Sequence, residues 1–306
     1  MSDYAEIVVV GSLNVDMVVS SKRMPVVGET IFGEQFRTVS GGKGANQAVS
    51  CARLGAQVSM LGAVGNDAFG KQVLDDLMQY GVNTSHIATL DIPTGTATII
   101  HTPEDNRIIV VPGANERYSV DKLGPFEAHI ANAKVLLIQL EINYETVERA
   151  IQVARDNQVT VILNPAPARA LPRHILDAVD YLTPNETEFE QLIGSSFSTE
   201  EQLEHQLREW ETSYKSKVII TRGSMGCSYL SENELITVPP LPVQVVDTTG
   251  AGDCFNGAFA YQLTRNSSLT EAVQFAVRAS SLSVSIFGAQ ASMPTIESVM
   301  SGSISS

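Results

Sequence analysis

Short apolar runs alternate with amphipathic helical segments along most of this 306-residue chain. The apolar runs predict buried strands at Glu6–Val10, Val135–Leu140, Thr160–Leu163, Asp180–Leu182 and Val218–Thr221. The amphipathic segments predict helices at Ala45–Leu54, Lys71–Tyr80, Tyr144–Asn157, Glu200–Tyr214 and Ala272–Val284. Such alternation favours a mostly parallel sheet covered by helices on both faces, and ligands of these sheets collect at the carboxyl ends of the strands.

Two regions, at approximately 14–39 and 94–111, interrupt this alternation with extended segments and no helix between them. The strands expected there are Val15–Val19, Thr30–Val39, Thr96–Thr102 and Arg107–Val111, the last two as a hairpin. Together they predict a small antiparallel sheet at the edge of the core, where it could act as a lid over a ligand. Because so small a sheet is marginal by itself, we expect it to pack on the core or to pair with a second subunit.

The charge balance and the cysteine content exclude several classes of protein. With 34 acidic and 20 basic side chains the net charge is −14, which disfavours nucleic-acid and anionic-membrane surfaces. The three cysteines are sparse and scattered, so we expect a reducing compartment rather than a disulfide scaffold. The N-terminus lacks the basic start and the long apolar centre of a signal peptide, and no apolar run reaches the length of a membrane span. The sequence therefore predicts a cytoplasmic location.

The segment 243–260, VQVVDTTGAGDCFNGAFA, carries the strongest chemical signal. It predicts a strand at Val243–Val246, a turn at Gly250–Gly252 and an apolar helix that opens at Asp253. Amides that converge at a helix N-terminus bind anions, and an aspartate there can accept a proton from a substrate hydroxyl during phosphoryl transfer. The simpler interpretation is a glycine turn with Asp253 as the helix N-cap. The density of glycine, aspartate and threonine favours the anion site.

A second glycine-rich segment, Ser40-Gly41-Gly42-Lys43-Gly44-Ala45-Asn46, also leads into a predicted helix. Paired glycines permit close backbone approach, and Lys43 and Asn46 supply hydrogen-bond donors for a polyhydroxylated ligand. The alternative interpretation is a purely structural turn. The segment is not a Walker A loop, and the residues after the first strand do not form a GxGxxG dinucleotide fingerprint.

Three further groups of polar residues follow predicted strands. Asn14 and Asp16 alternate, so their side chains point to the same side and suit sugar hydroxyls, unless they belong to a solvated turn. Asn185-x-x-Glu188 fits a helix capping box, and it fits equally a pair that holds Mg²⁺ waters and phosphate oxygens. The Thr221–Gly226 loop, which contains one arginine, could line the phosphates of a nucleotide or form a hairpin turn.

These segments occur in the order found in the ribokinase branch of the PfkB carbohydrate-kinase family, which the chain closely resembles over essentially its whole length. The most specific matches are Asp247–Asp253 (DTTGAGD) and Gly41–Asn46 (GGKGAN). The resemblance implies one domain over residues 1–306 with a ribokinase-like three-layer α/β/α core, a mostly parallel sheet and a small antiparallel β lid. It also implies a homodimer whose contact is made by the lid.

The resemblance further implies transfer of the ATP γ-phosphate to a primary hydroxyl of a sugar, which in this branch is O5 of D-ribose. By matching motif, Asp253 resembles the catalytic base, and Gly250, Ala251 and Gly252 resemble the anion hole. The residues that resemble the sugar contacts are Asn14, Asp16, Gly42, Lys43, Gly44, Asn46, Glu141 and Asp253.

Nucleotide and cation sites are implied in the same way. The residues that match nucleotide contacts are Asn185, Thr221, Arg222, Gly223, Ser224, Gly226 and Gly252, with Val277 beside the adenine. Glu188 completes the element linked to Mg²⁺ and phosphate. A monovalent cation, usually K⁺, activates these enzymes, and its matching residues are Asp247, Thr249, Ser283, Ile286, Gly288 and Ser292.

Two alternatives remain open from the sequence. The same chemistry could act on 2-deoxyribose or another furanose. A sugar sensor without catalysis would require a damaged Asp253 or anion hole, and both motifs are intact. Val277 can pack against a base but cannot form a hydrogen bond with it, so the nucleotide preference is also left open.

Overall fold

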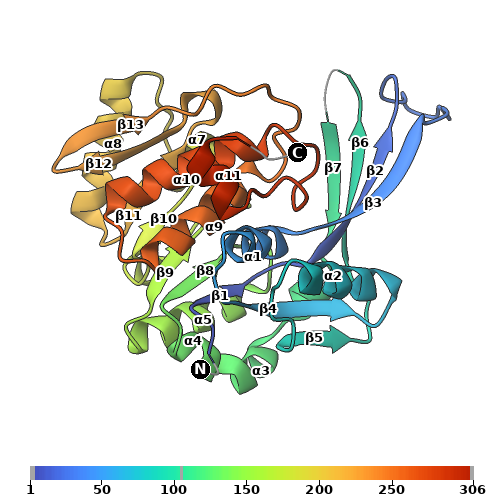
Figure 1. The fold of residues 1–306 in the computed structure, drawn as a ribbon, viewed down its shortest axis with the longest axis horizontal. Coiled ribbons are helices and arrows are strands. Elements are labelled where there is room, and N and C mark those ends of the chain that lie inside the picture. Colours follow the sequence, from blue (N-terminus) through green and yellow to red (C-terminus); the bar gives the residue numbers. More distant parts are fainter. Residues whose placement is uncertain (1–3, 104–105, 304–306) are drawn as a thin grey trace.

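The computed structural model describes residues 4–103 and 106–303. Its core is a nine-stranded sheet in the order β13-β12-β11-β10-β9-β8-β1-β4-β5 (Figure 1). The strands are β1 (Ile7–Val10), β4 (Val58–Gly65), β5 (Ile87–Leu90), β8 (Val135–Ile138), β9 (Thr160–Leu163), β10 (Tyr181–Leu182), β11 (Lys217–Thr221), β12 (Cys227–Ser231) and β13 (Glu234–Val238). The five strands predicted from the alternation are confirmed with small shifts of their ends.

Seven adjacent strands of this sheet pair in parallel, in the order β11-β10-β9-β8-β1-β4-β5. At one edge, β12 and β13 add an antiparallel hairpin. β1 lies near the centre, where Val8 is opposite both Ser59 of β4 and Leu136 of β8. Because parallel strands end at the same edge of a sheet, the loops that follow them gather there.

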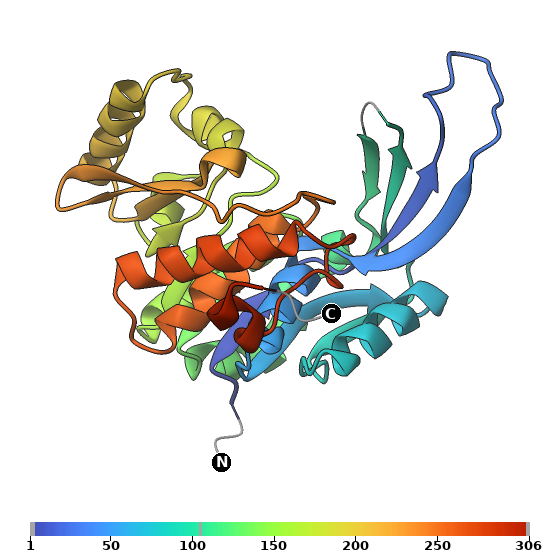
Figure 2. The same cartoon turned by 45° about the horizontal axis from the view of Figure 1, so that its top comes forward.

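Helices cover both faces of the sheet (Figures 1 and 2). Side chains alternate along β1, so Ile7 and Val9 enter one buried cluster and Val8 and Val10 enter the other. The helices on the first cluster are α1 (Lys43–Arg53), α2 (Ala68–Gln79), α9 (Ala251–Leu263), α10 (Leu269–Ser283) and α11 (Ile296–Ser301). Those on the second are α3 (Val120–Leu123), α4 (Glu127–Ala131), α5 (Tyr144–Asp156), α6 (Arg173–Leu176), α7 (Glu186–Ile193) and α8 (Glu200–Ser213). All five predicted helices are present.

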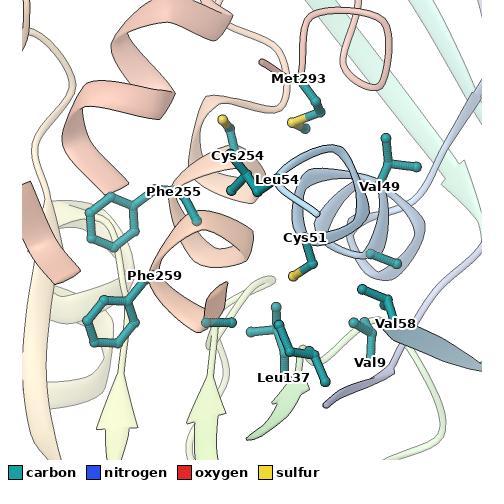
Figure 3. Packing of buried hydrophobic residues seen from close by; sticks show 14 of the residues in the cluster. Val9, Val49, Cys51, Leu54, Val58, Leu137, Cys254, Phe255, Phe259 and Met293 are labelled. Carbon is teal, nitrogen blue, oxygen red and sulfur yellow. The ribbon is translucent and has the colours of Figure 1, made fainter. Parts of the chain in front are cut away.

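The packing of α1 against α9 positions the candidate site. Figure 3 shows α1, which carries Cys51, beside α9, which carries Cys254 and Phe255, and all three side chains belong to the first buried cluster. The Ser50 hydroxyl donates to the carbonyl oxygen of Cys254 at 3.1 Å. A side chain on Gly257 would collide with Ser50, so the glycine allows the two helices to approach closely. The N-terminal turns of α1 and α9 are therefore held near each other.

The two interruptions form a separate four-stranded sheet that projects from the core (Figure 2). Its strands, in the order β3-β2-β6-β7, are β2 (Asn14–Ser20), β3 (Gln35–Gly41), β6 (Gly95–His101) and β7 (Asn106–Val111). The outer pairs are antiparallel, and the central pair β2–β6 is parallel. Because β2 ends at Ser20, opposite Gln35, the predicted strand Thr30–Val39 is wrong before Gln35. Residues 104–105, between β6 and β7, lie outside the described residues.

The predicted strand Val243–Val246 is wrong, because this segment is a loop with no strand beside it in the described part of the chain. Three prolines between positions 239 and 242 remove the backbone donors that a sheet would need just before it. The Val246 amide donates instead to the carbonyl oxygen of Val284, which follows α10, at 2.8 Å. The loop therefore connects the sheet to the start of α9 along the end of α10.

Within residues 4–103 and 106–303, no helix has the length and apolarity to cross a membrane. Even α10 contains 15 residues, whereas a span needs about 20. All three cysteines, Cys51, Cys227 and Cys254, are free and buried.

Candidate active site

A cavity of about 200 Å³ lies at the carboxyl ends of the central strands. Its walls come from the loops after β9 and β10, the end of β11, the loop before α9 and the first turns of α1, α7 and α9. The lining residues are Lys43, Asn164, Ala166, Thr183, Asn185, Glu188, Thr221, Thr248, Gly250, Ala251, Gly252, Asp253 and Asn256. The cavity thus brings together residues from several of the predicted motifs.

Asp253 lies in the first turn of α9 and is 8% exposed. Its Oδ2 accepts a hydrogen bond from Asn46 Nδ2 at 2.9 Å, and its Oδ1 accepts one from Gln47 Nε2 at 3.0 Å. Burial raises the pKa of Asp253, although the charge of Lys43 and the two amide donors oppose this effect. The carboxylate is therefore a stronger base than an exposed aspartate.

The predicted anion cradle lies at the start of α9. The N-cap is Gly250, so the interpretation of Asp253 as the N-cap is wrong. Gly250 has a φ of 77°, and a side chain there would crowd Ala289. A Cβ on Gly252 would meet no atom within 4 Å among the described residues, so the helix start is open to a ligand. The unpaired amides of this turn carry partial positive charge.

The glycines of the second segment allow close backbone contacts before α1. Gly42 has a φ of 89°, and a side chain on it would collide with the Ser12 carbonyl oxygen. A side chain on Gly44 would meet the backbone of Gly11 and Ser12 in the same way. The tight turn therefore requires these glycines, and it also places Lys43 in the cavity wall.

Asp16 projects from β2 beside Gly41, where any side chain would collide with the Asp16 carboxylate. Burial raises the pKa of Asp16 to about 6, and the negative charges of Glu141 and Asp253 add to this effect. Asp16 therefore belongs to one cluster of charged side chains with Glu141 and Asp253, as its predicted role in sugar binding requires.

Lys43 supplies the positive charge of this centre. Burial alone would lower its pKa, but the carboxylates of Asp253, Glu141 and Glu188 raise the pKa above its usual value. Glu141 Oε2 accepts hydrogen bonds from Ser12 Oγ at 2.6 Å and from the Lys43 amide at 3.3 Å. The lysine therefore stays protonated among three acidic side chains.

Asn14 and Asn46 complete the predicted sugar contacts. Asn14 Oδ1 accepts from Asn115 Nδ2 at 2.8 Å, so the NH₂ group of Asn14 remains its donor for a ligand. Asn115 also binds both backbone polar groups of Leu13, which fixes the corner between β1 and β2. Among the described residues, the buried Oδ1 of Asn46 has no hydrogen-bond partner. Such an orphaned acceptor suits a ligand hydroxyl.

Asn185 and Glu188 form the capping box of α7 and also line the cavity. Asn185 Oδ1 accepts from the Glu188 amide, and Glu188 Oε2 accepts from the Asn185 amide, each at 2.8 Å. Burial raises the pKa of Glu188; the Asn185 amide and Lys43 oppose this, whereas Asp253 adds to it. The two interpretations left open by the spacing are therefore compatible.

The Thr221–Gly226 segment is a hairpin turn between β11 and β12, and Thr221 lines the cavity. The Arg222 side chain forms ion pairs with Glu186 at 3.0 Å and with Glu200 at 2.7 Å. Its charge is thus already paired within the protein. Gly223 and Ser224 lie in a short 3₁₀ turn, Gly223–Met225, that is not part of the cavity wall.

Val277 lies apart from this cavity. It is a core residue of α10 and borders a second cavity, of about 480 Å³, together with Pro239 and Leu241. The structure therefore does not place Val277 in the cavity wall with other predicted nucleotide contacts, but in the wall of the second cavity.

The two segments of the predicted cation site meet through Asp247. Its Oδ1 accepts from the amide and the hydroxyl of Thr249, and its Oδ2 accepts from the Gly288 amide at 2.9 Å. The hydroxyls of Ser283 and Ser292 instead donate to carbonyl oxygens of Ser280 and Ala289. Ile286 lies in the loop after α10, where its amide donates to the carbonyl oxygen of Ser283 at 3.3 Å.

Sequence reasoning assigned no role to Gln47, Asn164, Thr183 and Asn256. Gln47 donates a hydrogen bond to Asp253, and the other three residues line the cavity. A usable signal existed for Asn164 and Thr183, because each directly follows a predicted strand at the ligand-binding edge. Gln47 gives no such signal, because it lies inside the predicted helix Ala45–Leu54 and does not follow a strand.

A family model for pfkB family carbohydrate kinases matches residues 5–296. A ribokinase of Bacillus subtilis is 43% identical over 294 residues, which are 94% of this chain and 96% of the relative. A deoxyribokinase of Salmonella typhi is 34% identical over 295 residues, which are 95% and 96%. The solved structure of an Arabidopsis thaliana ribokinase complexed with ribose and ATP matches with a TM-score of 0.90, at 35% identity over 98% of both chains. This chain is therefore a member of the pfkB family of carbohydrate kinases.

Proposed function

We propose that this chain is a ribokinase that transfers the γ-phosphoryl group of ATP to O5 of D-ribose. The observation that carries the proposal is the buried Asp253 carboxylate, which lies between a polar cluster suited to a sugar and the amide-rich start of α9. The Bacillus subtilis relative is a ribokinase, and the matching Arabidopsis thaliana structure holds ribose and ATP.

In this mechanism Asp253 accepts the proton of the ribose 5-hydroxyl as O5 bonds to the γ-phosphorus in line with the leaving ADP oxygen. Its raised pKa brings the base closer to the working pH. The amides of Gly250–Gly252 and the charge of Lys43 stabilise the negative charge on the transferred group. Closure of the small sheet as a lid would exclude water, which would otherwise compete with the sugar.

Mg²⁺ fits the cavity wall at Glu188 and Asn185. Hard divalent cations prefer oxygen ligands, and these residues present a carboxylate and an amide oxygen at the cavity. When bound with ATP, the ion would neutralise phosphate charge. We also place the phosphates near Thr221 and Gly252, and the adenine toward Val277, where an apolar side chain contributes packing without a hydrogen bond.

The proposal is tested by measuring ADP release with Mg-ATP and K⁺ for D-ribose, 2-deoxyribose, fructose and adenosine side by side. We expect the highest kcat/KM for ribose. The deoxyribokinase relative makes 2-deoxyribose the second candidate, and a higher kcat/KM for it would change the acceptor but keep the chemistry. Tight sugar binding without turnover of any acceptor would overturn the kinase assignment.

We propose K⁺ as an activator at the Asp247 site. The carboxylate of Asp247 links the segment of Thr249 to that of Gly288, next to the start of α9. A cation held by carboxylate and backbone oxygens would stabilise this loop and, through it, the anion hole.

Exchanging K⁺ for Na⁺ at constant ionic strength should lower kcat severalfold, because Na⁺ is smaller and fits a cavity of carbonyl oxygens less well. Initial rates over a titration of each chloride salt measure this effect. Choline chloride serves as the control for ionic strength. Equal rates in all three salts would contradict the cation site.

We further propose a homodimer formed by the lid in a cytoplasmic, reducing setting. The small sheet exposes large apolar side chains in the strands and in the segment between β2 and β3; they are Val26, Val27, Phe32, Phe36, Ile108, Ile109, Val110 and Val111. An apolar patch of this kind is typical of a protein–protein interface. The three buried free thiols support a reducing compartment.

A further inference from the structure

A chain of buried side-chain amides leads from Asp253 into the core. Gln47 Nε2 donates to Asp253 Oδ1 at 3.0 Å and to Asn164 Oδ1 at 3.2 Å. Gln47 Oε1 accepts from Gln139 Nε2 at 2.6 Å. Gln47 and Gln139 are fully buried. Gln47 therefore uses both amide hydrogens and its oxygen in contacts within the protein.

The orientation of the Gln47 amide follows from a backbone group at the far end of this chain. Asn164 Nδ2 donates to the carbonyl oxygen of Thr183 at 3.0 Å, and a carbonyl can only accept. Asn164 must therefore turn its Oδ1 toward Gln47. A reversed Gln47 amide would set its oxygen against the oxygens of both Asn164 and Asp253, so the NH₂ group faces the carboxylate.

The α1–α9 interface holds Gln47 in place. Cys51 Sγ donates to the carbonyl oxygen of Gly257 in α9 at 3.3 Å, and Gln47 precedes Cys51 by four residues, so both lie on the face of α1 that packs against α9. Gln139 comes directly after β8, and the absence of a side chain on Gly11 leaves room for its Oε1. Neither amide can rotate without breaking contacts that are shut off from water.

We propose that Gln47 is a positioning residue for phosphoryl transfer, which fixes the plane of the Asp253 carboxylate, and that Gln139 in turn fixes the Gln47 amide. Rotation of a carboxylate about its last side-chain bond is loosely restrained, so a base of this kind needs external contacts to stay aimed. Asn46 holds one oxygen and Gln47 holds the other. The inference rests on the proposed function in taking Asp253 as the base.

The charged groups that act on Asp253 come from four neighbouring elements. They are Lys43 at the start of α1, Asp16 on β2, Glu141 after β8 and Glu188 on α7. Gln47 is neutral, so its removal leaves all these charges in place. Loss of its N–H donor removes one of the interactions that lower the pKa of Asp253, and this pKa should rise.

The test is the Gln47→Leu variant, in which an apolar side chain of similar size replaces the donor. We expect the pKa of Asp253 to rise by about one pH unit. The titration is followed by NMR of ¹³C-carboxyl-labelled aspartate, with the signal assigned from Asp253→Asn. We also expect a kcat at least about tenfold lower, with the KM for ribose changed by less than about threefold, and an acid limb of the rate profile at higher pH.

Ser50→Ala is the matched control. It removes another buried hydrogen bond between α1 and α9, but one that does not involve Asp253, so the Asp253 titration should stay unchanged. An unchanged Asp253 titration in folded Gln47→Leu would overturn the inference. If Gln47→Leu does not fold, Gln139→Leu is measured in its place, and we expect a smaller change in the same direction; no change there would overturn it. The NMR titration needs no turnover. If the unaltered protein were inactive as a kinase, the proposed function would be overturned, but the titration would still test the effect of Gln47 on Asp253.

Discussion

Replacement of Asp253 by asparagine is expected to lower kcat by about 10²–10⁴-fold, because it removes the base that takes the proton of the sugar hydroxyl. The fold should tolerate the change. Burial disfavours the charged form of Asp253, and asparagine carries no charge. The NH₂ group of an asparagine at position 253 would face the NH₂ group of Asn46, and two donors cannot form a hydrogen bond with each other. Asn46 can rotate its side-chain amide so that its unpartnered Oδ1 accepts from the new NH₂ group.

Sugar binding separates this outcome from a general loss of structure. Ribose titrated calorimetrically into Asp253→Asn should bind with a Kd within about tenfold of that of the unaltered protein, since one hydrogen bond contributes about 1 kcal/mol. Steady-state ADP release gives kcat for both proteins. A variant with more than about a tenth of the original kcat would show that Asp253 is not the base.

Replacement of Asp16 by asparagine is expected to stabilise the protein while it weakens sugar binding. The pKa of Asp16 is raised from 3.8 to about 6, so the ionised carboxylate destabilises the folded state above pH 6. At pH 8, Asp16→Asn should increase the free energy of unfolding by about 1–3 kcal/mol, and the upper end of this range corresponds to the full difference in pKa. Loss of a charged hydrogen bond should raise the Kd for ribose by about 10–100-fold. Denaturant unfolding and calorimetry measure the two effects.

The pH dependence provides the control for Asp16. A raised folded-state pKa contributes stability that is present below pH 3.8 and is lost as the pH rises through about 6. The stability difference between the variant and the unaltered protein should therefore shrink as the pH is lowered from 8 toward 4. Ribose affinity of the unaltered protein should fall below pH 6. A variant less stable than the unaltered protein at pH 8 would contradict the account.

The elements with a clear hydrophobic period were predictable from the sequence. Thr160–Leu163 is apolar and short, and it is a buried strand with the expected bounds. Val243–Val246 contains three valines, yet it is a loop, because strand formation also requires a free sheet edge beside it. Local pattern cannot show that edge. The parallel pairing of β2 with β6 likewise depends on contacts between residues about 80 positions apart.

In the candidate site, too, local motifs could be predicted from the sequence, whereas long-range contacts could not. Asp253 and Gly250–Gly252 could be predicted as site residues because their motif is local to one helix start. Gln47 could not be predicted because its hydrogen bond to Asp253 forms at an interface, with a residue 206 positions later in the chain. The ion pairs of Arg222 could not be predicted for a similar reason, since its partners Glu186 and Glu200 belong to other elements. Residue type and spacing report local chemistry, whereas long-range pairing decides which groups are free to act.

Identification of the product formed from D-ribose and Mg-ATP is the direct test of phosphoryl transfer to O5. ³¹P NMR of the reaction mixture distinguishes phosphorylation at O5 from phosphorylation at another hydroxyl by the coupling of phosphorus to the protons of its carbon. We expect stoichiometric ribose 5-phosphate and ADP, and no product with Asp253→Asn on the same timescale. Release of inorganic phosphate alone, or a phosphate ester at another position, would contradict this expectation.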